Sequence, residues 1–257
     1  MPSTPSQRYI TVVPVYKAEP TKTEALSLLQ LKMLGVQNVT LVCPENLNLE
    51  LYLDLWPQLQ VQRLPSENFT SVQSYNNLVL TPAFYRPFAE LYEYLLIYQL
   101  DAFLLSNRVL EFCDQGYDYY GAPWKIGFPQ YRFLFNRWPI RINSKRFHVG
   151  NGGLSLRKIK TTLDLLERKA GHISKSFFME DAFFGYWGAI DPNFHACPTL
   201  TAAKFSLEMD PEYWSNKTGE LPMGFHGFEV WHQDFYNPLI QKSYSRLIEE
   251  FPKLQNL

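Results

Sequence analysis

Residues 9–15 read YITVVPV and residues 39–43 read VTLVC, and these two runs decide the class of the fold. Both are almost continuously apolar and rich in β-branched residues, a pattern typical of strands buried on both faces of a parallel sheet. Between them, Thr21 or Thr23 can cap a helix that Gly35 closes. A strand, a helix and a strand in this order form a right-handed βαβ unit, so the sequence predicts an α/β fold with a mostly parallel sheet.

Later segments extend this sheet and add helices. We expect strands at residues 61–64, 94–105 and 203–208, and helices at residues 75–90, 158–170, 176–187 and 238–251. Residues 47–56 show no regular period, and residues 125–146 give few regular signals, which favours a long insertion or lid. Neither an internal repeat nor a clean linker divides the chain, so we expect one domain.

The composition excludes several classes of protein. The 257 residues carry 24 Lys and Arg against 25 Asp and Glu, and 46% are apolar, which is typical of a folded globular protein. The net charge of -1 provides no overall field that would hold nucleic acid. The 3 cysteines lack metal-binding spacing, and residues 1–8 lack the apolar core of a secretory signal. We expect a cytoplasmic protein that contacts a membrane at most peripherally, at its inner face.

Asp101 follows the apolar run of residues 94–98 (YLLIY). Open α/β sheets bind ligands at the carboxyl ends of their strands, so this position favours a ligand role. A carboxylate there can hold a divalent cation, which in turn can neutralise a diphosphate leaving group. The alternative is an aspartate that only accepts a hydrogen bond from a loop amide.

A glycine-rich turn lies within residues 147–157 (FHVGNGGLSLR). Gly150, Gly152 and Gly153 carry no Cβ, so the backbone around Asn151 can approach a ligand closely. The string lacks the Gly-Lys-Ser/Thr of a Walker loop and the spacing of a dinucleotide-binding fingerprint. A tight β-turn with no further role is the alternative.

Two more candidate groups lie downstream. Glu180 and Asp181 are adjacent acids in the aromatic run of residues 176–187 (SFFMEDAFFGYW), where one of them could serve as a general base with a raised pKa. Acids at a helix start are also favoured without any catalytic role. His226 lies in a small-residue loop, residues 222–227 (PMGFHG), that could present an imidazole to a cation or phosphate, although a lone histidine is more often structural.

Taken in order, six strings resemble the bacterial glycosyltransferase-like proteins of the GT-A superfamily that are catalogued as a domain of unknown function. The strings are YEYLLIYQLDAFLL, DYYGAPW, VGNGGLSLR, MEDAFFG, AAKFSLE and PMGFHG, and the resemblance covers residues 9–227. It implies one Rossmann-like GT-A domain, with a mostly parallel central sheet flanked by helices. It also implies transfer of a sugar from a nucleotide-sugar to an acceptor hydroxyl, usually with Mn²⁺ or Mg²⁺. Residues 8–115 would then form the nucleotide-binding half, and residues 116–257 the acceptor-binding and catalytic half.

The resemblance implies a metal site and a sugar platform. Asp101 stands where the superfamily has the metal-binding acid of its Asp-any-Asp motif, and His226 would complete the metal site. Gln99 replaces the first acid of that motif, so the ribose contact would be an amide. The turn made of Gly150, Asn151, Gly152 and Gly153 resembles the platform for the acceptor and the donor sugar.

The resemblance also implies an inverting reaction. Asp181 would be the base, and Glu180 would orient the acceptor or the start of the helix. In this reaction Asp181 deprotonates an acceptor hydroxyl, which attacks the anomeric carbon from the face opposite the nucleotide. The cation and nearby donors take the charge that develops on the diphosphate.

The acceptor is expected to be a glycan or a lipid-linked molecule. Residues 119–163 contain no Asp or Glu but 9 Lys and Arg, among them Arg132, Arg137 and Arg141. This excess charge favours an anionic acceptor, such as a phosphorylated glycan or a lipid-linked sugar phosphate at a membrane surface. The alternative is a solvated loop that balances acids elsewhere.

Three other functions remain open from the sequence. A nucleotide-sugar or carbohydrate-binding protein without turnover would retain the glycine turn, and Gln99 in place of an acid favours it. A glycoside hydrolase would need carboxylates flanking a glycosidic bond, but the βαβ start disfavours that class. Nucleic-acid binding through residues 125–146 would weaken steeply with salt, and we do not expect it.

Overall fold

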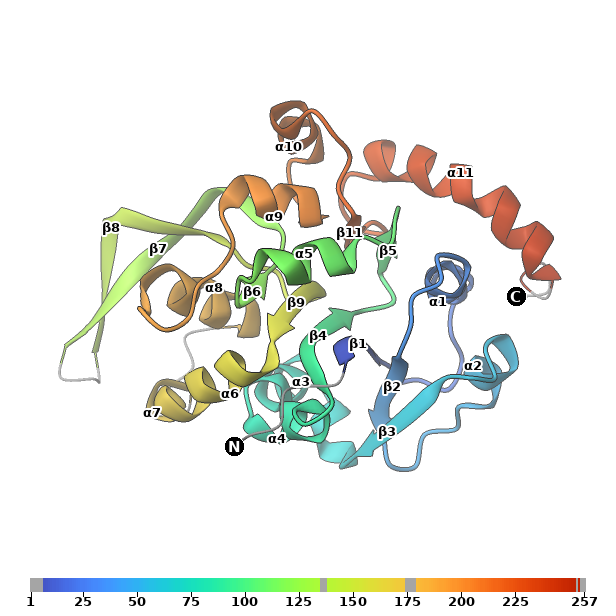
Figure 1. The fold of residues 1–257 in the computed structure, drawn as a ribbon, viewed down its shortest axis with the longest axis horizontal. Helices are drawn as coiled ribbons and strands as arrows, with labels where there is room; N and C mark the ends of the chain where they lie inside the picture. Colours follow the sequence, from blue (N-terminus) through green and yellow to red (C-terminus); the bar gives the residue numbers. More distant parts are fainter. Residues whose placement is uncertain (1–6, 135–137, 174–178, 253, 255–257) are drawn as a thin grey trace.

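A six-stranded sheet forms the centre of the fold (Figure 1). In spatial order its strands are β3 (Gln60–Leu64), β2 (Val39–Pro44), β1 (Gln7–Pro14), β4 (Tyr92–Tyr98), β9 (Leu154–Lys158) and β6 (Tyr119–Tyr120). The strands from β3 to β4 run parallel, and β9 is antiparallel to both of its neighbours. The predicted α/β fold with a mostly parallel sheet is confirmed.

This computed structural model describes residues 7–134, 138–173, 179–252 and 254, without the side chains of residues 130–134, 138–145 and 173. Its α-helices are α1 (Lys22–Met33), α2 (Glu50–Leu55), α3 (Val72–Val79), α4 (Pro82–Tyr85), α5 (Val109–Gln115), α6 (Ile159–Arg168), α7 (Ala170–Ile173), α8 (Glu180–Ile190), α9 (Thr199–Phe205), α10 (Pro211–Thr218) and α11 (Gln233–Glu250). Two 3₁₀ turns, η1 (Ser66–Phe69) and η2 (Arg86–Phe88), flank α3 and α4. Among the helices so described, none combines the length and apolarity needed to cross a bilayer.

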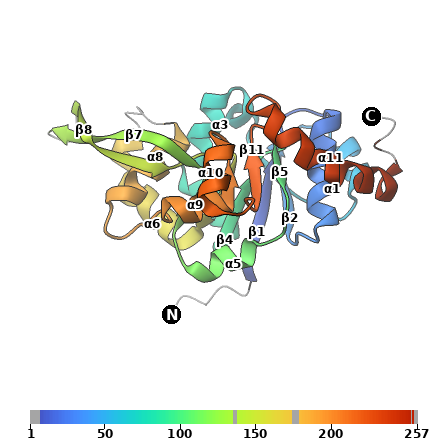
Figure 2. The same ribbon diagram turned by 90° about the horizontal axis from the view of Figure 1, so that it is seen from above.

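Two smaller sheets adjoin the central one. The first is three-stranded, with β11 (Gly224–His226) between β10 (Ser206–Leu207) and β5 (Ala102–Leu104). The second is the hairpin of β7 (Pro123–Leu134) and β8 (Trp138–Val149). Figures 1 and 2 both show this hairpin extending away from the body of the molecule.

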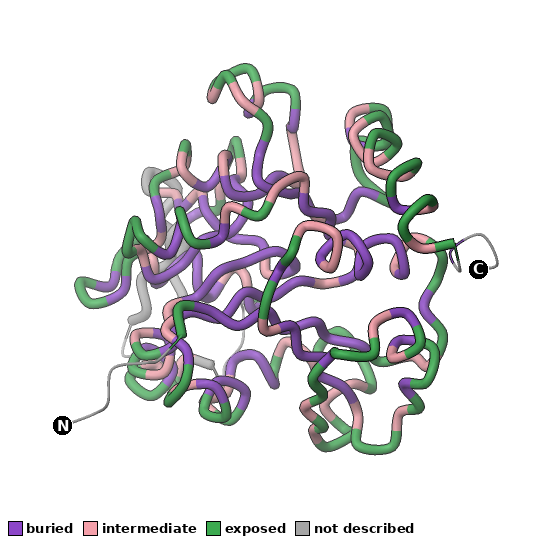
Figure 3. Tube along the Cα trace, turned by 45° about the vertical axis from the view of Figure 1, so that its right-hand side comes forward, coloured by how far each residue is buried: buried purple, intermediate pink, exposed green. Residues whose placement is uncertain are grey.

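Burial explains why the first strands were recognisable in the sequence. The central sheet runs through the interior except for its exposed edge strand β3, and the outer turns of the helices are exposed (Figure 3). Val12, Val13, Leu41 and Val42 are 0% exposed, as expected for strands covered on both faces. Thr21 caps α1 through a capping box, which confirms one of the two predicted helix starts.

Several segments differ from the sequence-based expectation, among them the helix expected at residues 75–90, which is divided into α3, α4 and η2. The expected strand at residues 94–105 breaks into β4 and β5, because a turn at residues 99–101 carries the chain from one sheet to the other. Both halves are buried, so their apolarity hid the break. Residues 125–134 and 138–146, expected to be part of an irregular insertion, belong to β7 and β8, and residues 47–56 contain α2. The first half of the strand expected at residues 203–208 is the end of α9, followed by the short β10.

Candidate functional site

The strand order of the central sheet reverses between β1 and β4. From β1 the chain continues to β2 and β3 on one side, and β4 then returns to the other side of β1. Open α/β sheets bind ligands outside the carboxyl ends of the strands at such a switch point. A cavity of about 640 Å³ opens there, lined by residues 14–17 at the end of β1 and just after it, by the η1–α3 segment and by residues 99–101.

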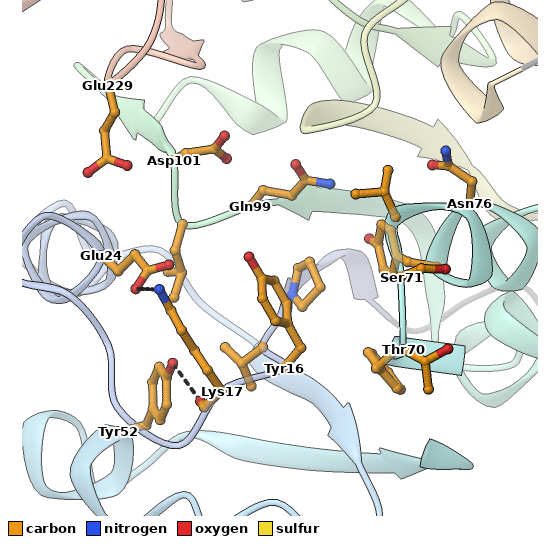
Figure 4. A pocket seen from close by; sticks show the side chains of 16 residues that line it. Tyr16, Lys17, Glu24, Tyr52, Thr70, Ser71, Asn76, Gln99, Asp101 and Glu229 are labelled. Atoms are coloured by element: carbon orange, nitrogen blue, oxygen red, sulfur yellow. Dashed lines mark hydrogen bonds and ion pairs between the residues drawn. The ribbon is translucent and has the colours of Figure 1, made fainter. Parts of the chain in front are cut away.

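The cavity combines aromatic and polar side chains (Figure 4). The ring of Tyr16 is 65% exposed and stands among the lining residues, where a planar group could stack on it. Lys17 Nζ is held 2.8 Å from Glu24 Oε2, and the hydroxyl of Tyr52 donates to the main-chain oxygen of Lys17. The buried hydroxyl of Tyr75 lies near Gln99 but has no hydrogen-bond partner of good geometry among the described residues. The cavity therefore offers ring surface and polar groups to a ligand.

Negative charge predominates around this cavity. Lys17 is cationic, but it is already paired with Glu24. Asp101 and Glu229 add two further carboxylates to the lining. An anionic ligand such as a diphosphate would therefore need an additional cation beside it.

Strand pairing brings Asp101 and His226 together. The turn after β4 places Asp101 directly before β5, and β5 pairs antiparallel with β11, with Ala102 opposite His226. The main-chain N–H of Gly227 also donates to the main-chain oxygen of Asp101, at 3.0 Å. As a result, Asp101 Oδ1 lies 3.1 Å from His226 Nε2.

The glycine turn packs against these same residues. β9 pairs with β4 so that Leu154 lies opposite Tyr98, and the N–H of Gln99 donates to the oxygen of Gly153 at 2.8 Å. A Cβ on Gly153 would overlap His226 Nε2, and a Cβ on Gly152 would overlap the Glu180 carboxylate. The turn thus needs glycine because protein side chains already approach its backbone closely.

Asn151 fixes the conformation of this turn. Its backbone adopts a left-handed φ of 68°, and its Oδ1 accepts a hydrogen bond from the N–H of Gly153 at 3.0 Å. Its Nδ2 lies 3.3 Å from His226 Nδ1. Gly150 packs against Trp124, whose ring would overlap a Cβ at that position.

His226 lies between two carboxylates. Asp101 approaches Nε2, and Glu208 Oε1 lies 3.2 Å from Nδ1. Burial alone would lower the pKa of His226. The hydrogen bonds to Asp101 and Glu208 outweigh this effect and raise that pKa to about 9. For Asp101, burial acts to raise the pKa. The hydrogen bond to His226 has the larger effect, so the pKa of Asp101 lies below its usual value. Without another cation, the imidazolium offsets one of the two negative charges of Asp101 and Glu208.

The donor atoms around His226 Nε2 fit a divalent cation. Gln99 Oε1 and Asp101 Oδ1 each lie 3.1 Å from Nε2. In an octahedral site with bonds of about 2.1 Å, adjacent ligand atoms are about 3.0 Å apart, so a cation could replace the proton that these atoms share. Within the described part of the chain, no group of three His, Cys, Asp or Glu side chains forms a metal site, and here the third donor is an amide oxygen. The carboxylate and amide oxygens suit Mn²⁺ or Mg²⁺, and the imidazole nitrogen favours Mn²⁺ of the two.

Glu180 pairs with a buried cation. Glu180 is 6% exposed at the start of α8, and its Oε1 accepts a hydrogen bond from Nη2 of Arg157, which is 0% exposed on β9. Arg157 Nη1 donates to the hydroxyl of Tyr85 at 2.6 Å, and Ser155 Oγ accepts from Arg157 and donates to the oxygen of Gly152. This network ties the start of α8 to the glycine turn. Of the two roles expected for Glu180, the geometry supports orientation of the helix start.

Asp181, unlike Glu180, forms no ion pair with any of the described residues. Its Oδ1 accepts a hydrogen bond from the N–H of Ala182 at 2.6 Å. Burial raises the pKa of Asp181, and the negative charge of Glu208 adds to this effect, while the N–H of Ala182 and the positive charges of Arg157 and His226 act in the opposite direction. A raised pKa is a property expected of a general base near neutral pH.

The structure thus gathers the sequence-predicted residues in one region, from Gln99 and Asp101 through the glycine turn to the start of α8. Sequence reasoning missed Glu208, Arg157, Tyr16 and the rest of the cavity lining. The string AAKFSLE contained Glu208, but only the pairing of β10 with β11 reveals what this residue contacts. Arg137 lies outside the described residues, and the side chains of Arg132 and Arg141 are likewise not described, so the basic stretch stays a prediction.

A family of proteins matches about two thirds of the chain. The profile of the family described as "Protein of unknown function (DUF5672)" matches residues 58–226. The chain belongs to this family. The matched segment includes Gln99, Asp101, the glycine turn, Asp181 and His226, but not β1 or Tyr16. None of the curated protein sequences matches the chain.

Solved structures resemble the fold across most of its length. The apo form of mouse xyloside xylosyltransferase 1 is 16% identical with a TM-score of 0.53, over 86% of this chain and 97% of that chain. The galactosyltransferase LgtC, in complex with donor and acceptor sugar analogues, is 9% identical with a TM-score of 0.51, over 90% of this chain and 95% of that chain. At such low identity the likeness concerns the fold, which is the GT-A fold.

Proposed function

We propose that the protein is a glycosyltransferase that moves a sugar from a nucleotide-sugar donor to an acceptor hydroxyl. The main observation in support of this proposal is the position of the cavity relative to the donor atoms around His226. The cavity at the switch point between β1 and β4 opens directly beside Gln99, Asp101 and His226. A nucleotide in the cavity would therefore have its diphosphate next to this group of donor atoms. The GT-A fold supports the proposal, since the xylosyltransferase and galactosyltransferase it resembles carry this activity in their names.

The nucleobase, the diphosphate and the sugar of the donor would each lie at a different part of the cavity. The nucleobase stacks on the exposed ring of Tyr16. The diphosphate lies near Asp101 and His226, and the sugar lies against the glycine turn. Residues 8–115 then serve as the nucleotide-binding half, and residues 116–257 provide most of the acceptor side and the base.

Mn²⁺ or Mg²⁺ would be held by Asp101, His226 and the amide oxygen of Gln99. When bound, such a cation offsets the charge that develops on the leaving diphosphate. The acidic lining of the cavity supports this assignment, because the paired Lys17 alone does not neutralise a diphosphate. Gln99 thus becomes a ligand of the cation in place of the ribose contact that its sequence position suggested.

Asp181 would act as the base of an inverting reaction. Its carboxylate removes the proton of the acceptor hydroxyl, whose oxygen then attacks the anomeric carbon as the bond to the diphosphate breaks. Glu180 and Arg157 hold the helix start that carries Asp181. The acceptor would be a glycan or a lipid-linked molecule, anionic because of the basic stretch of residues 119–163, from which Arg157 is excluded because it is buried and paired with Glu180. Replacing Arg132, Arg137 and Arg141 by Glu should then raise the KM for the acceptor and leave hydrolysis of the donor alone intact.

A second candidate is a nucleotide-sugar-binding protein without turnover, favoured by Gln99 in place of an acid. One experiment separates the two: incubation with a panel of nucleotide-sugars and Mn²⁺, with release of nucleoside diphosphate measured over hours. Enzymes of this kind are expected to hydrolyse their donor slowly when no acceptor is present. Release that depends on Asp181 supports a transferase, whereas tight binding with no release from any donor supports the binding protein.

A further inference from the structure

Glu208 lies beside His226 because of a strand pairing. It directly follows β10, which runs parallel to β11 with Leu207 opposite Phe225, so the next residues along the two strands are Glu208 and His226. Tyr236 donates its hydroxyl hydrogen to the main-chain oxygen of Glu208 at 3.0 Å, which fixes the end of β10. The side chain of Glu208 is 19% exposed and that of His226 is 14% exposed, so both are shielded from competing water.

Two side chains approach the same nitrogen of His226 with opposite hydrogen-bonding character. Glu208 Oε1 lies 3.2 Å from Nδ1, and an ionised carboxylate only accepts hydrogen bonds. Asn151 Nδ2 lies 3.3 Å from Nδ1 and only donates, because Asn151 Oδ1 is occupied by the N–H of Gly153. Glu208 therefore matches a ring with hydrogen on Nδ1, and Asn151 matches a ring without it.

Ligation of a cation selects between these two states. An imidazole that binds a cation through Nε2 uses the lone pair of that atom, so the ring hydrogen must be on Nδ1. Nε2 is the nitrogen that faces Gln99 and Asp101. Of the two neighbours of Nδ1, Glu208 is the one that stabilises this state.

We infer that Glu208 is a positioning residue for the divalent cation: it fixes the Nδ1–H tautomer and the orientation of His226, and so presents Nε2 to the cation held with Gln99 and Asp101. Glu208 contacts neither cation nor substrate in this scheme. The inference rests on the proposed metal-assisted glycosyl transfer and names a residue that supports it. A carboxylate behind a metal-binding histidine strengthens metal affinity by about 10-fold to 100-fold.

The test measures Mn²⁺ binding directly, through the electron paramagnetic resonance signal of free Mn²⁺ during a titration of the full chain. Glu208→Gln can turn its amide NH₂ toward Nδ1 and favour the wrong tautomer, so its Mn²⁺ affinity should fall about 10-fold to 100-fold. Glu212→Gln removes the same charge from an exposed position on nearby α10 and should bind Mn²⁺ as the wild type does. Melting curves of both variants verify the fold.

A second variant separates hydrogen bonding from charge. Glu208→Asp keeps the negative charge but draws the carboxylate back from Nδ1, so its Mn²⁺ affinity should also fall several-fold. If Glu208→Gln does not fold, Glu208→Asp serves as the test variant in its place. Unchanged affinity in a folded Glu208→Gln or Glu208→Asp variant overturns the inference and leaves glycosyl transfer standing. A wild type that binds a nucleotide-sugar but no Mn²⁺ also overturns the inference alone, whereas a wild type that binds neither overturns the proposed function as well.

Discussion

Asp101 Oδ1 and His226 Nε2 lie 3.1 Å apart at the edge of the cavity between β1 and β4. The turn that ends β4 and the antiparallel pairing of β5 with β11 produce this contact. The same turn places Gln99 Oε1 3.1 Å from Nε2. No single sequence motif contains all three atoms, because Gln99 and Asp101 lie in one string and His226 lies in another.

Replacing Asp101 by Asn should remove the support that Mn²⁺ gives to nucleotide binding. The amide retains the shape of the side chain but lacks the charge that a divalent cation requires. Calorimetric titration of a nucleoside diphosphate, with and without Mn²⁺, measures the effect, and Asp234→Asn on the exposed first turn of α11 is the matched control. Equal Mn²⁺-supported affinity in wild type and Asp101→Asn would remove Asp101 from the metal site.

Gly153→Ala should displace His226. The new Cβ would overlap His226 Nε2, so the ring must move away from Asp101. We expect a loss of stability of about 1–3 kcal/mol in denaturant unfolding, together with weakened Mn²⁺ binding. Gly171→Ala is the control, because a Cβ at Gly171 has no neighbouring atom within 4 Å. A Gly153→Ala variant with wild-type Mn²⁺ affinity would contradict the close packing of the turn on His226.

The buried pair of Arg157 and Glu180 should be important for stability. Glu180→Gln leaves the positive charge of Arg157 buried without its counter-charge, at a cost of about 3–5 kcal/mol in urea unfolding. The double variant Arg157→Met/Glu180→Met should recover most of that loss. By comparison, Arg86→Gln breaks an exposed pair with Glu167 and should cost less than about 1 kcal/mol. Equal losses of unfolding free energy in Glu180→Gln and Arg86→Gln would show that the buried pair contributes no more to stability than the exposed pair.

Asp181 should control both the rate and its pH dependence. Asp181→Asn should lower turnover by about 100-fold or more while donor affinity is retained. A base works only when deprotonated, and burial raises the pKa of Asp181, so kcat/KM should fall on the acid side at a pH above the usual range of an aspartate. A rate profile measured from pH 4 to pH 8 tests this expectation. If Glu180→Gln loses turnover and Asp181→Asn does not, the two roles are reversed.

Sequence patterns predicted the elements whose residue pattern lies within one continuous segment of the chain. The βαβ start could be predicted because β1 and β2 are buried on both faces, which makes their residues continuously apolar. Asp101 could be identified as a candidate ligand-binding residue because it follows such an apolar run. The break after Tyr98 could not be predicted, since β4 and β5 are both buried and no polar residue except Gln99 and Asp101 interrupts them.

Contacts between distant segments could not be predicted from the sequence. Glu208 approaches His226 only through the register of β10 with β11, and Arg157 meets Glu180 only because α8 packs against β6 and β8, which brings its first residue to Arg157. Strand register and helix packing are set by the whole fold. The hairpin of β7 and β8 escaped prediction because its sequence mixes cations and aromatic residues without a clear period of two.

The central claim is that the cavity between β1 and β4 binds a nucleotide-sugar with the help of a divalent cation at Asp101, Gln99 and His226. The most direct test is a panel of nucleotide-sugars, each added with Mn²⁺ or with a chelator, and the melting temperature of the protein measured for each. The account predicts that at least one donor stabilises the wild type in the presence of Mn²⁺, by ~2.7 kcal/mol at one hundred times its Kd, and that the chelator and Asp101→Asn abolish this effect. No stabilisation by any nucleotide-sugar, with or without Mn²⁺, would contradict it.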